Sequence, residues 1–376
     1  MANNNENKVL NVPHLRFPEF SGEWDSFKLV ELGKFIGGGT PSSSNLSFWT
    51  GSIPWISSSD IKEDNINNIS ISRYITEDAI EKSATKYCPA PVILIVSRVG
   101  VGKVALSHTS LCTSQDFCNI IDIKCHPVFL SYNLLRTMKR KSREVQGTSI
   151  KGITSDELQK IRVFIPKNKD EQNKISNLLT LLDERIATQN KIIEKLQSLI
   201  KGIAQSIVLR NKPNVRISQC LACSSSTLQE SDVLEYGTYP VYGANNVVGY
   251  LDNYSTQSEA IYIIKDGSGV GAVSYVTGKC SATGTLNVLQ AKYGYLLQYL
   301  YYLLKVFNFE PYKTGMAIPH IYFKDYSKAK IFCPSYSEQL RYAKLLSTID
   351  RKLLAEQNTL SNLSLQKQYL LRQMFI

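Results

Sequence analysis

The segment EQNKISNLLTLLDERIATQNKIIEKL, from Glu171 to Leu196, decides the fold because it recurs as EQLRYAKLLSTIDRKLLAEQNTLSNL from Glu338 to Leu363. Hydrophobic residues repeat every seven positions along the first copy, on two lines offset by four, and the second copy keeps the phase. This pattern predicts a long helix with one apolar seam in each copy. The predicted seam contains Leu179, Leu182, Ile186, Ile193, Leu346, Ile349, Leu353 and Leu360, with Gln189 and Glu356 as matching polar breaks and Lys367 as a further exception.

The repeat extends upstream of both helices. The segment from Gln146 to Pro166 matches the segment from Lys313 to Pro334, with Gly147 aligned to Gly315. Further back, GVGKVA at 100–105 parallels GVGAVS at 269–274. The chain is therefore two copies of one unit, each a globular domain followed by a long helix.

Chain connectivity predicts how the two helices pair. The first helix delivers the chain to the second domain, and the nearest partner for the seam of the second helix is the first helix, met antiparallel. If each helix spans about 38 residues, Gln189 and Glu356 meet near the midpoint as a polar layer that fixes the register. The alternative is that both side chains point to solvent at the edge of the seam.

Each globular part has the pattern of an α+β domain. The runs at 91–96, 119–123 and 260–264 are rich in β-forming residues and bounded by turn residues, whereas 129–143 and 295–306 are typical of helices. The predicted fold is α+β, with two domains separated by a long antiparallel two-helix coiled coil and related by a pseudo-two-fold repeat. The predicted boundaries are 1–167 and 211–337 for the domains, and 168–210 and 338–376 for the helices.

The positive net charge favours a polyanionic partner, and it favours nucleic acid over an anionic membrane surface. The chain carries 43 Lys and Arg against 32 Asp and Glu, a formal net charge of +11. The surplus is uneven, because 128–167 holds nine basic residues and three acids, whereas 213–337 holds nine and eight. The first residues, MANNNENKVL, do not resemble a secretion signal, and no apolar run is long enough for a membrane span. A cytoplasmic location with reduced cysteines is expected.

Candidate catalytic and metal motifs are incomplete. Gly100-Val-Gly-Lys103 resembles a phosphate loop but lacks its first glycine and has Val104 where Ser or Thr would bind magnesium. Asp116, Asp122 and Lys124 resemble the acids and lysine of a metal-dependent nuclease, but the second domain has no counterpart. Cys220 and Cys223 have metal-ligand spacing without a second pair. No catalytic centre and no metal site are expected.

Features suited to DNA are better represented. Five cations lie on the predicted helix that starts at Phe129 and are followed by the hydroxyl-rich segment 147–151. Cations neutralise phosphates, while hydroxyls and backbone amides position a protein on a duplex. The five cations are Arg136, Lys139, Arg140, Lys141 and Arg143. A solvated helix face is the alternative interpretation of this charge run.

The order of several motifs resembles the specificity subunit of type I restriction–modification systems. Both long helices begin shortly after a proline with Glu-Gln, and the chain opens with VPHLRFPEF at 12–20. Leu32-x(4)-Gly-Gly-Gly-Thr-Pro41, Ile53-Pro-Trp-Ile56 and the Tyr239-Pro-Val-Tyr-Gly243 motif of one class of target-recognition domain follow in order. The helix cores around Asp183 and Asp350 complete the resemblance, which covers nearly the whole chain.

The resemblance implies a non-catalytic subunit that reads double-stranded DNA. Each target-recognition domain would read one half of a bipartite, asymmetric target, and the helix pair would space the domains and dock two methyltransferase subunits. Restriction/translocase subunits would join for cleavage. The chain itself would bind no cofactor, since S-adenosylmethionine, ATP and magnesium belong to the partner subunits. Further candidate DNA-binding residues are Thr40, Ser57, Ser58, Ser59, Arg98, Lys103, Ser149 and Lys151 in the first domain, and Asn245, Asn246, Lys265, Thr283, Thr314 and His320 in the second.

Two alternatives of other classes remain open at this point. One is a self-sufficient DNA methyltransferase or nuclease, and the other is a coiled-coil scaffold that binds only proteins. The target sequence does not follow from the residues, because base choice depends on loop geometry and DNA shape.

Overall fold

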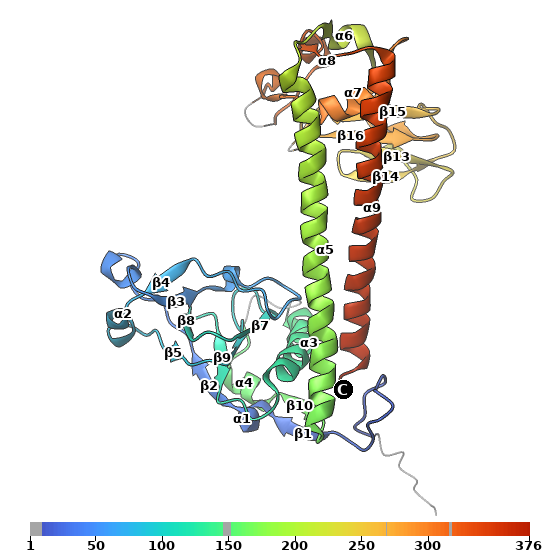
Figure 1. Cartoon of the computed structure of the whole chain (residues 1–376). Helices are drawn as coiled ribbons and strands as arrows, with labels where there is room; N and C mark the ends of the chain where they lie inside the picture. The colour runs from blue at the N-terminus through green and yellow to red at the C-terminus, as the bar shows by residue number, and fades with distance from the viewer. Residues whose placement is uncertain (1–9, 146–151, 268, 316–317) are drawn as a thin grey trace, which may run out of the picture. The chain divides into compact units, whose positions relative to one another are not determined.

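The chain divides into two compact units that share two long helices. The computed structural model describes residues 10–145, 152–267, 269–315 and 318–376. Unit 1 contains Met1–Thr188 and Leu360–Ile376, and unit 2 contains Gln189–Thr359. Figure 1 shows α5 (Lys169–Arg210) and α9 (Tyr336–Gln373) as continuous helices. Each unit therefore holds one part of α5 and one part of α9 together with its own globular domain.

Three small sheets and several helices form the globular part of unit 1. One sheet has the order β2-β9-β6-β7 and is antiparallel, a second has the order β4-β3-β8-β5 with β3 parallel to β8, and β1 pairs with β10. The strands are β1 (Asp25–Lys28), β2 (Lys34–Gly37), β3 (Ile53–Ile56), β4 (Arg73–Ile75), β5 (Tyr87–Cys88), β6 (Val92–Ile95), β7 (Val104–Ser107), β8 (Leu111–Thr113), β9 (Cys118–Ile121) and β10 (Arg162–Ile165). The helices are α1 (Leu29–Leu32), η1 (Leu46–Trp49), η2 (Ser58–Asp60), α2 (Glu77–Glu81), α3 (Pro127–Val145) and α4 (Ser155–Lys160).

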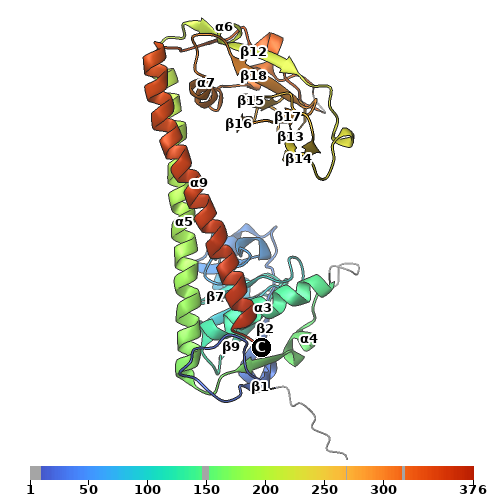
Figure 2. The same cartoon turned by 90° about the vertical axis from the view of Figure 1, so that its right-hand side faces the viewer.

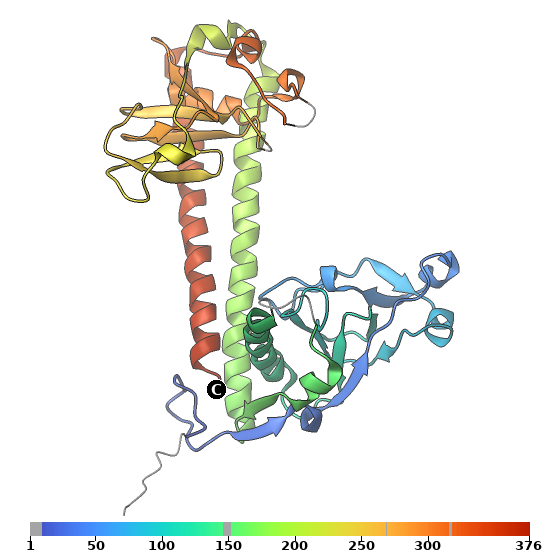
Figure 3. The same ribbon diagram turned by 180° about the vertical axis from the view of Figure 1, so that it is seen from behind.

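The main core of unit 1 joins its sheets to the long helices. Helix α3 lies against α5, as Figure 3 shows. Its Phe129 packs edge-to-face on Trp24, with ring centroids 5.7 Å apart, and also contacts Phe375 after the end of α9. Ile175 and Leu179 of α5 and Leu370 of α9 belong to the same buried cluster. The seam of the long helices is thus continuous with the core of the domain.

Unit 2 repeats this architecture. One sheet has the order β12-β18-β15-β16, a second has the order β14-β13-β17 with β13 parallel to β17, and β11 pairs with β19. Figure 2 shows α7 beside the first of these sheets. The strands are β11 (Val215–Arg216), β12 (Leu221–Ser225), β13 (Tyr239–Gly243), β14 (Asn246–Leu251), β15 (Glu259–Ile264), β16 (Val273–Thr277), β17 (Ser281–Ala282), β18 (Leu286–Ala291) and β19 (Lys330–Ile331). The helices are α6 (Ile217–Cys220), η3 (Glu230–Asp232), α7 (Leu297–Leu304), η4 (Glu310–Tyr312) and α8 (Phe323–Tyr326).

The glutamine of each Glu-Gln pair closes the junction between domain and helix. Gln172 donates to the carbonyl of Pro166 at 2.9 Å and accepts from the backbone amide of His126 at 3.0 Å. In unit 2, Gln339 donates to the carbonyl of Pro334 at 2.9 Å and accepts from the amide of Leu296 at 2.9 Å. The repeated motif therefore satisfies backbone groups next to the start of each long helix.

The glutamate of the first Glu-Gln pair has an additional role. Glu171 is buried and receives two hydrogen bonds from Arg16, at 2.7 and 2.8 Å, and one from the indole of Trp24 at 3.2 Å. The backbone amide of Leu15 also bonds to the carbonyl of Gln373 at 2.9 Å. The opening VPHLRFPEF segment thus holds the start of α5 and the end of α9 within unit 1.

A tyrosine–aspartate hydrogen bond attaches each domain to its long helix. Tyr132 on α3 donates to Asp183 on α5 at 2.8 Å, and Tyr302 on α7 donates to Asp350 on α9 at 3.2 Å. Asp183 and Asp350 occupy the same position in the two copies of the helical segment. The duplication therefore extends from the sequence to individual hydrogen bonds.

The heptad exception Lys367 forms a buried ion pair in unit 1. The side chains of Lys367 and Asp183 are 5% and 3% exposed, and the ammonium also bonds to the backbone carbonyl of Asp64. Burial raises the pKa of the Asp183 carboxyl, while Lys367 and Tyr132 act in the opposite direction. A charged group at a seam position is thus matched by an opposite charge from the facing helix.

Gln189 and Glu356 face each other in unit 2. The amide of Gln189, which is 8% exposed, donates to the backbone carbonyl of Glu356 at 3.0 Å and to its carboxylate. Lys352 also pairs with this carboxylate, and the two hydrogen bonds lower the pKa of Glu356. The helices are therefore antiparallel here, and the two polar breaks do not point to solvent.

We expect Lys367→Met to lower the free energy of unfolding by about 3–5 kcal/mol, because it leaves the Asp183 carboxylate buried without a cation. Adding Asp183→Asn should recover part of this loss, because the buried charge is then removed while Tyr132 keeps an acceptor. Urea unfolding of the full chain measures both. Lys82→Ala, which breaks an exposed pair with Asp78, serves as the control and should cost less than about 1 kcal/mol. Equal effects of Lys367→Met and the control would contradict this account.

The Gln189–Glu356 layer is expected to fix register at a cost in stability. The double change Gln189→Leu with Glu356→Leu should raise the melting temperature, since two polar groups leave the seam. It should also broaden the distance distribution between spin labels at the exposed positions Lys191 and Asn358. An unchanged melting temperature and an unchanged distribution would show that the layer does not set the register.

Candidate nucleic-acid interface

Loops that leave the strands of unit 1 are tied together by backbone hydrogen bonds. The loop after β6 bonds to the β8–β9 loop, from the amide of Ser97 to the carbonyl of Asp116 at 2.8 Å. The amide of Ser114 donates to the carbonyl of Ile56, at the end of β3, at 2.9 Å. The amide of Gly39 donates to the carbonyl of Thr113 at 2.8 Å. The loops after β2, β3, β6 and β8 therefore form one assembly, which we call the unit 1 loop cluster (37–41, 57–60, 97–103 and 114–117).

The sequence-predicted residues of this cluster are connected to one another. Lys103 donates to the backbone carbonyl of Ser58 at 3.1 Å, which joins two loops. The hydroxyl of Thr40 bonds to Gln115. Ser57 lies 2.8 Å from the hydroxyl of Ser59. Thr40, Ser59 and Arg98 are exposed, whereas Ser57, Ser58 and Lys103 are half-buried. The structure thus brings Thr40, Ser57, Ser58, Ser59, Arg98 and Lys103 into one cluster.

Two polar residues in or next to the unit 1 loop cluster are not among those predicted from the sequence. Arg73 on β4 donates to Ser57 at 2.6 Å, pairs with Asp60 and lies 4.6 Å from the ring centre of Trp55. Gln115 is exposed beside Thr40. Arg73 stands opposite Trp55 in the β3–β4 register, and that pairing is not evident from sequence spacing.

The five cations of α3 differ in their surroundings and do not form a single exposed face. Arg136 donates to the carbonyl of Ile376 at 2.5 Å, and burial beside Arg140 lowers the pKa of its guanidinium. Lys139 pairs with the Asp64 carboxylate at 2.7 Å. Arg140 and Arg143 are exposed and Lys141 is half-buried. Ser149 and Lys151 lie outside the described residues.

The equivalent loops of unit 2 are tied in the same way. The amide of Lys265, after β15, bonds to the carbonyl of Thr285 at 2.9 Å, and the amide of Ile321 bonds to the carbonyl of Lys265 at 2.9 Å. In unit 1, Ile153 makes the matching bond to Ser97 at 2.7 Å. We call the residues 242–246, 264–267, 283–285, 314–315 and 318–321 the unit 2 loop cluster.

Side chains of the unit 2 loop cluster differ in their accessibility. Asn245 and Asn246 are exposed at the β13–β14 turn, where Asn246 has a φ of 83°. Thr314 is exposed and pairs through its backbone with half-buried His320. Lys265 is also half-buried. Thr283, a candidate DNA-binding residue in the sequence, is only 1% exposed, and its hydroxyl lies 2.8 Å from that of Thr285.

The Gly100–Lys103 segment and the cysteine pair Cys220 and Cys223, candidates in the sequence for a phosphate site and a metal site, lie in other environments. The lysine of the Gly100–Lys103 segment bonds to the carbonyl of Ser58. Cys220 is buried, and burial raises the pKa of Cys223 to about 11. In the described part of the chain, no group of three or more His, Cys, Asp or Glu side chains is arranged to hold a metal ion. None of the described helices has an apolar stretch long enough to cross a membrane.

Comparison with known proteins identifies relatives that each match about half of the chain. The MjaIX specificity subunit of a type I restriction enzyme of Methanocaldococcus jannaschii is 34% identical over 186 residues, which are 46% of this chain and 42% of that protein. The EcoR124I/EcoR124II specificity subunit of Escherichia coli is 32% identical over 206 residues, 53% of this chain and 47% of that protein. The chain thus spans less than half the length of these two relatives.

A solved structure shares the fold over the whole length. The type I restriction–modification S subunit from M. genitalium superposes with a TM-score of 0.67 at 20% sequence identity, and the match covers 97% of this chain and 99% of that one. The family model for the type I restriction modification DNA specificity domain matches residues 21–198 and again 221–364. These two matches cover most of both globular domains and most of both long helices, and the chain belongs to this family of type I restriction–modification DNA specificity proteins.

Proposed function

We propose that the chain reads double-stranded DNA in two parts, one by each unit. The observation that carries this proposal is that both units build a hydrogen-bonded loop cluster at an antiparallel sheet of corresponding strand order, β2-β9-β6-β7 in unit 1 and β12-β18-β15-β16 in unit 2, with different side chains. A duplicated scaffold with unlike loops suits two unlike half-sites. In this proposal residues 1–167 and 211–337 are the target-recognition domains, and 168–210 and 338–376 are the helical segments that connect them.

In unit 1 we assign phosphate binding to the exposed cations of α3. Arg140 and Arg143 contact the DNA backbone, and Lys141 contributes to the same positive potential. Arg136 and Lys139 act indirectly, because they anchor α3 to the C-terminal carbonyl and to Asp64. Ser149 and Lys151 lie outside the described residues and stay predicted DNA contacts.

Base reading is assigned to the exposed polar groups of the two loop clusters. In unit 1 these are Thr40 with Gln115, Ser59 and Arg98, while Ser57, Ser58 and Lys103 hold the loops in place. In unit 2 they are Asn245, Asn246 and Thr314, with Lys265 and His320 beside them. Amide and guanidinium groups suit this role, since they form paired hydrogen bonds with base edges in the major groove.

The family of the chain supports a proposal for its partners. Two methyltransferase subunits would dock on this subunit, and restriction/translocase subunits would join them. S-adenosylmethionine, ATP and magnesium would be bound by those partners, and the chain itself would carry no catalytic group. The near-neutral balance of 213–337, nine basic residues against eight acids, is consistent with part of the phosphate contact in unit 2 coming from a partner.

Methyl transfer tests this assignment against a self-sufficient enzyme. We expect the isolated chain, given S-adenosylmethionine and duplex DNA, to transfer no methyl groups. Together with its methyltransferase partner it should direct methylation to the small fraction of a random duplex library that shares one two-part sequence. Turnover by the isolated chain would refute a non-catalytic role. Methylation without sequence preference would favour a protein-binding scaffold.

Changes to α3 should weaken DNA binding without changing sequence preference. The double change Arg140→Ala with Arg143→Ala should reduce the affinity of the complex for specific and scrambled duplexes by a similar factor. The slope of log K against log salt should fall by about one for each phosphate that the variant no longer neutralises. The control is Lys328→Ala with Lys330→Ala, two exposed cations of unit 2 outside its loop cluster. If the slope does not change relative to this control, the phosphate assignment is wrong.

A further inference from the structure

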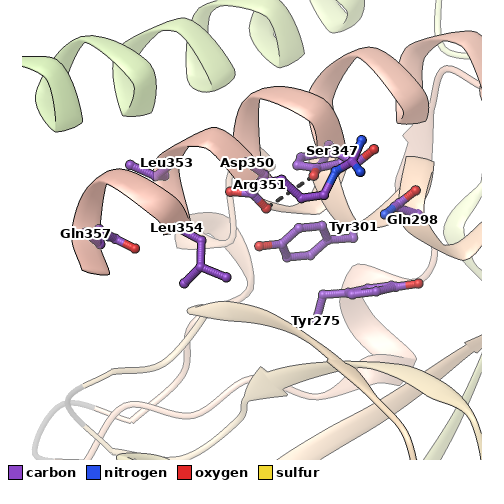
Figure 4. Close-up of a pocket in the computed structure, with 10 residues that line it drawn as sticks. Tyr275, Gln298, Tyr301, Ser347, Asp350, Arg351, Leu353, Leu354 and Gln357 are labelled. Atoms are coloured by element: carbon purple, nitrogen blue, oxygen red, sulfur yellow. Dashed lines mark hydrogen bonds between the residues drawn. The ribbon is translucent and has the colours of Figure 1, made fainter. Parts of the chain in front are cut away.

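Unit 2 contains a cavity that the DNA-reading proposal does not use. It has a volume of about 480 Å³ and lies between α9, α7 and β16. Asp350, Arg351 and Leu354 of α9 line one side, and Tyr301 of α7 and Tyr275 of β16 line the other (Figure 4). This size is within the range of small-molecule sites.

The polar lining of this cavity combines a carboxylate with aromatic rings. Asp350 accepts a hydrogen bond from Tyr302 at 3.2 Å, and Figure 4 shows its carboxylate facing the same space as the hydroxyl end of Tyr301. The ring of Tyr301 lies 4.9 Å from that of Tyr302 and 5.3 Å from that of Tyr275. A carboxylate framed by tyrosine rings favours a cation, because both attract positive charge.

The tyrosine–aspartate pair of unit 1 already holds such a cation. Tyr132 and Asp183 there receive Lys367, whose ammonium pairs with the carboxylate and lies 5.6 Å from the centre of the Tyr132 ring. The repeat relates Asp183 to Asp350, and it relates Lys367 to Ile200. Unit 2 therefore has the same acceptor but an isoleucine, 4% exposed, in place of the lysine.

The cations near Asp350 are engaged elsewhere. Arg351 donates to the hydroxyl of Thr348 at 3.3 Å, and Lys305 lies 5.2 Å from the ring centre of Tyr301. Neither Arg351 nor Lys305 forms an ion pair with Asp350. In the described part of unit 2 (189–267, 269–315 and 318–359), the side-chain hydrogen bond that the Asp350 carboxylate receives comes from Tyr302. The Asp350 carboxylate therefore faces the cavity, and no described Lys or Arg side chain of unit 2 forms an ion pair with it.

We infer that this cavity binds a primary alkylammonium group, which takes the place that Lys367 occupies in unit 1. The ammonium pairs with Asp350, and the alkyl chain lies along the rings of Tyr301 and Tyr275. Two sources supply this chemistry: a lysine side chain of a bound protein and a free polyamine. The inference does not depend on DNA reading, because it concerns a cavity outside both loop clusters.

Calorimetric titration of the full chain tests this inference with two probes, Nα-acetyl-lysine methylamide and spermidine. We expect saturable binding of at least one probe below about 10 mM, and the probe that binds more tightly indicates the source of the group. Asp350→Asn, which keeps the acceptor for Tyr302, should weaken this binding roughly tenfold or more, because a charge-assisted hydrogen bond becomes a neutral one. Glu235→Gln removes an exposed acid elsewhere in unit 2 and should leave the binding unchanged.

A second variant tests the correspondence between the two units. Ile200→Lys should place an ammonium next to Asp350, as Lys367 stands next to Asp183, and so abolish binding of either probe. Its melting temperature should fall when Asp350→Asn is added, because the new lysine then loses its partner. Absence of saturable binding to the unaltered chain would overturn the inference. Equal binding by the unaltered chain and by Asp350→Asn would overturn it as well.

Discussion

The antiparallel pairing of α5 and α9 is the constraint on which the rest of the structure depends. Each helix is amphipathic and would expose its apolar seam to water in isolation, so neither helix is expected to be stable without the other. The pairing also carries its own register signals. Asp183 with Lys367 in unit 1 and Gln189 with Glu356 in unit 2 are polar contacts at seam positions, and a shift along the helices would leave them unpaired.

The same helices organise the two domains. A glutamine next to the start of each helix binds the preceding proline carbonyl, and an aspartate farther along receives a tyrosine hydroxyl from the domain. Because both connections are duplicated, the two domains attach to their helices in the same way. What differs lies in the loops: at equivalent positions Arg98 stands against Asp266, and Gln115 against Gly284. Repetition therefore accounts for the scaffold, and the non-repeated side chains account for proposed differences in the DNA that each unit reads.

Sequence periodicity predicts the long helices well because a seam of this length depends on local spacing alone. It also predicts that Gln189 meets Glu356, since chain connectivity leaves an antiparallel arrangement as the simplest one. Sequence periodicity does not predict contacts between segments that are distant in the chain. Arg136 and Lys139 look like members of a charged row, but their partners Ile376 and Asp64 are 240 and 75 residues away in sequence. Lys367 looks like a defect in the heptads until Asp183 is seen to face it. The burial of Thr283 depends on tertiary packing that spacing does not record.

The central claim is that each unit reads its own half of the target, and a domain exchange tests it most directly. Residues 13–165 would be replaced by the matching domain of a relative, and the altered chain would be expressed with its methyltransferase partner. The methylated sequence would then be read from cellular DNA. The account predicts that one half of a two-part sequence changes, while the other half and the spacing between them stay the same. A change in both halves, or in neither, would contradict it.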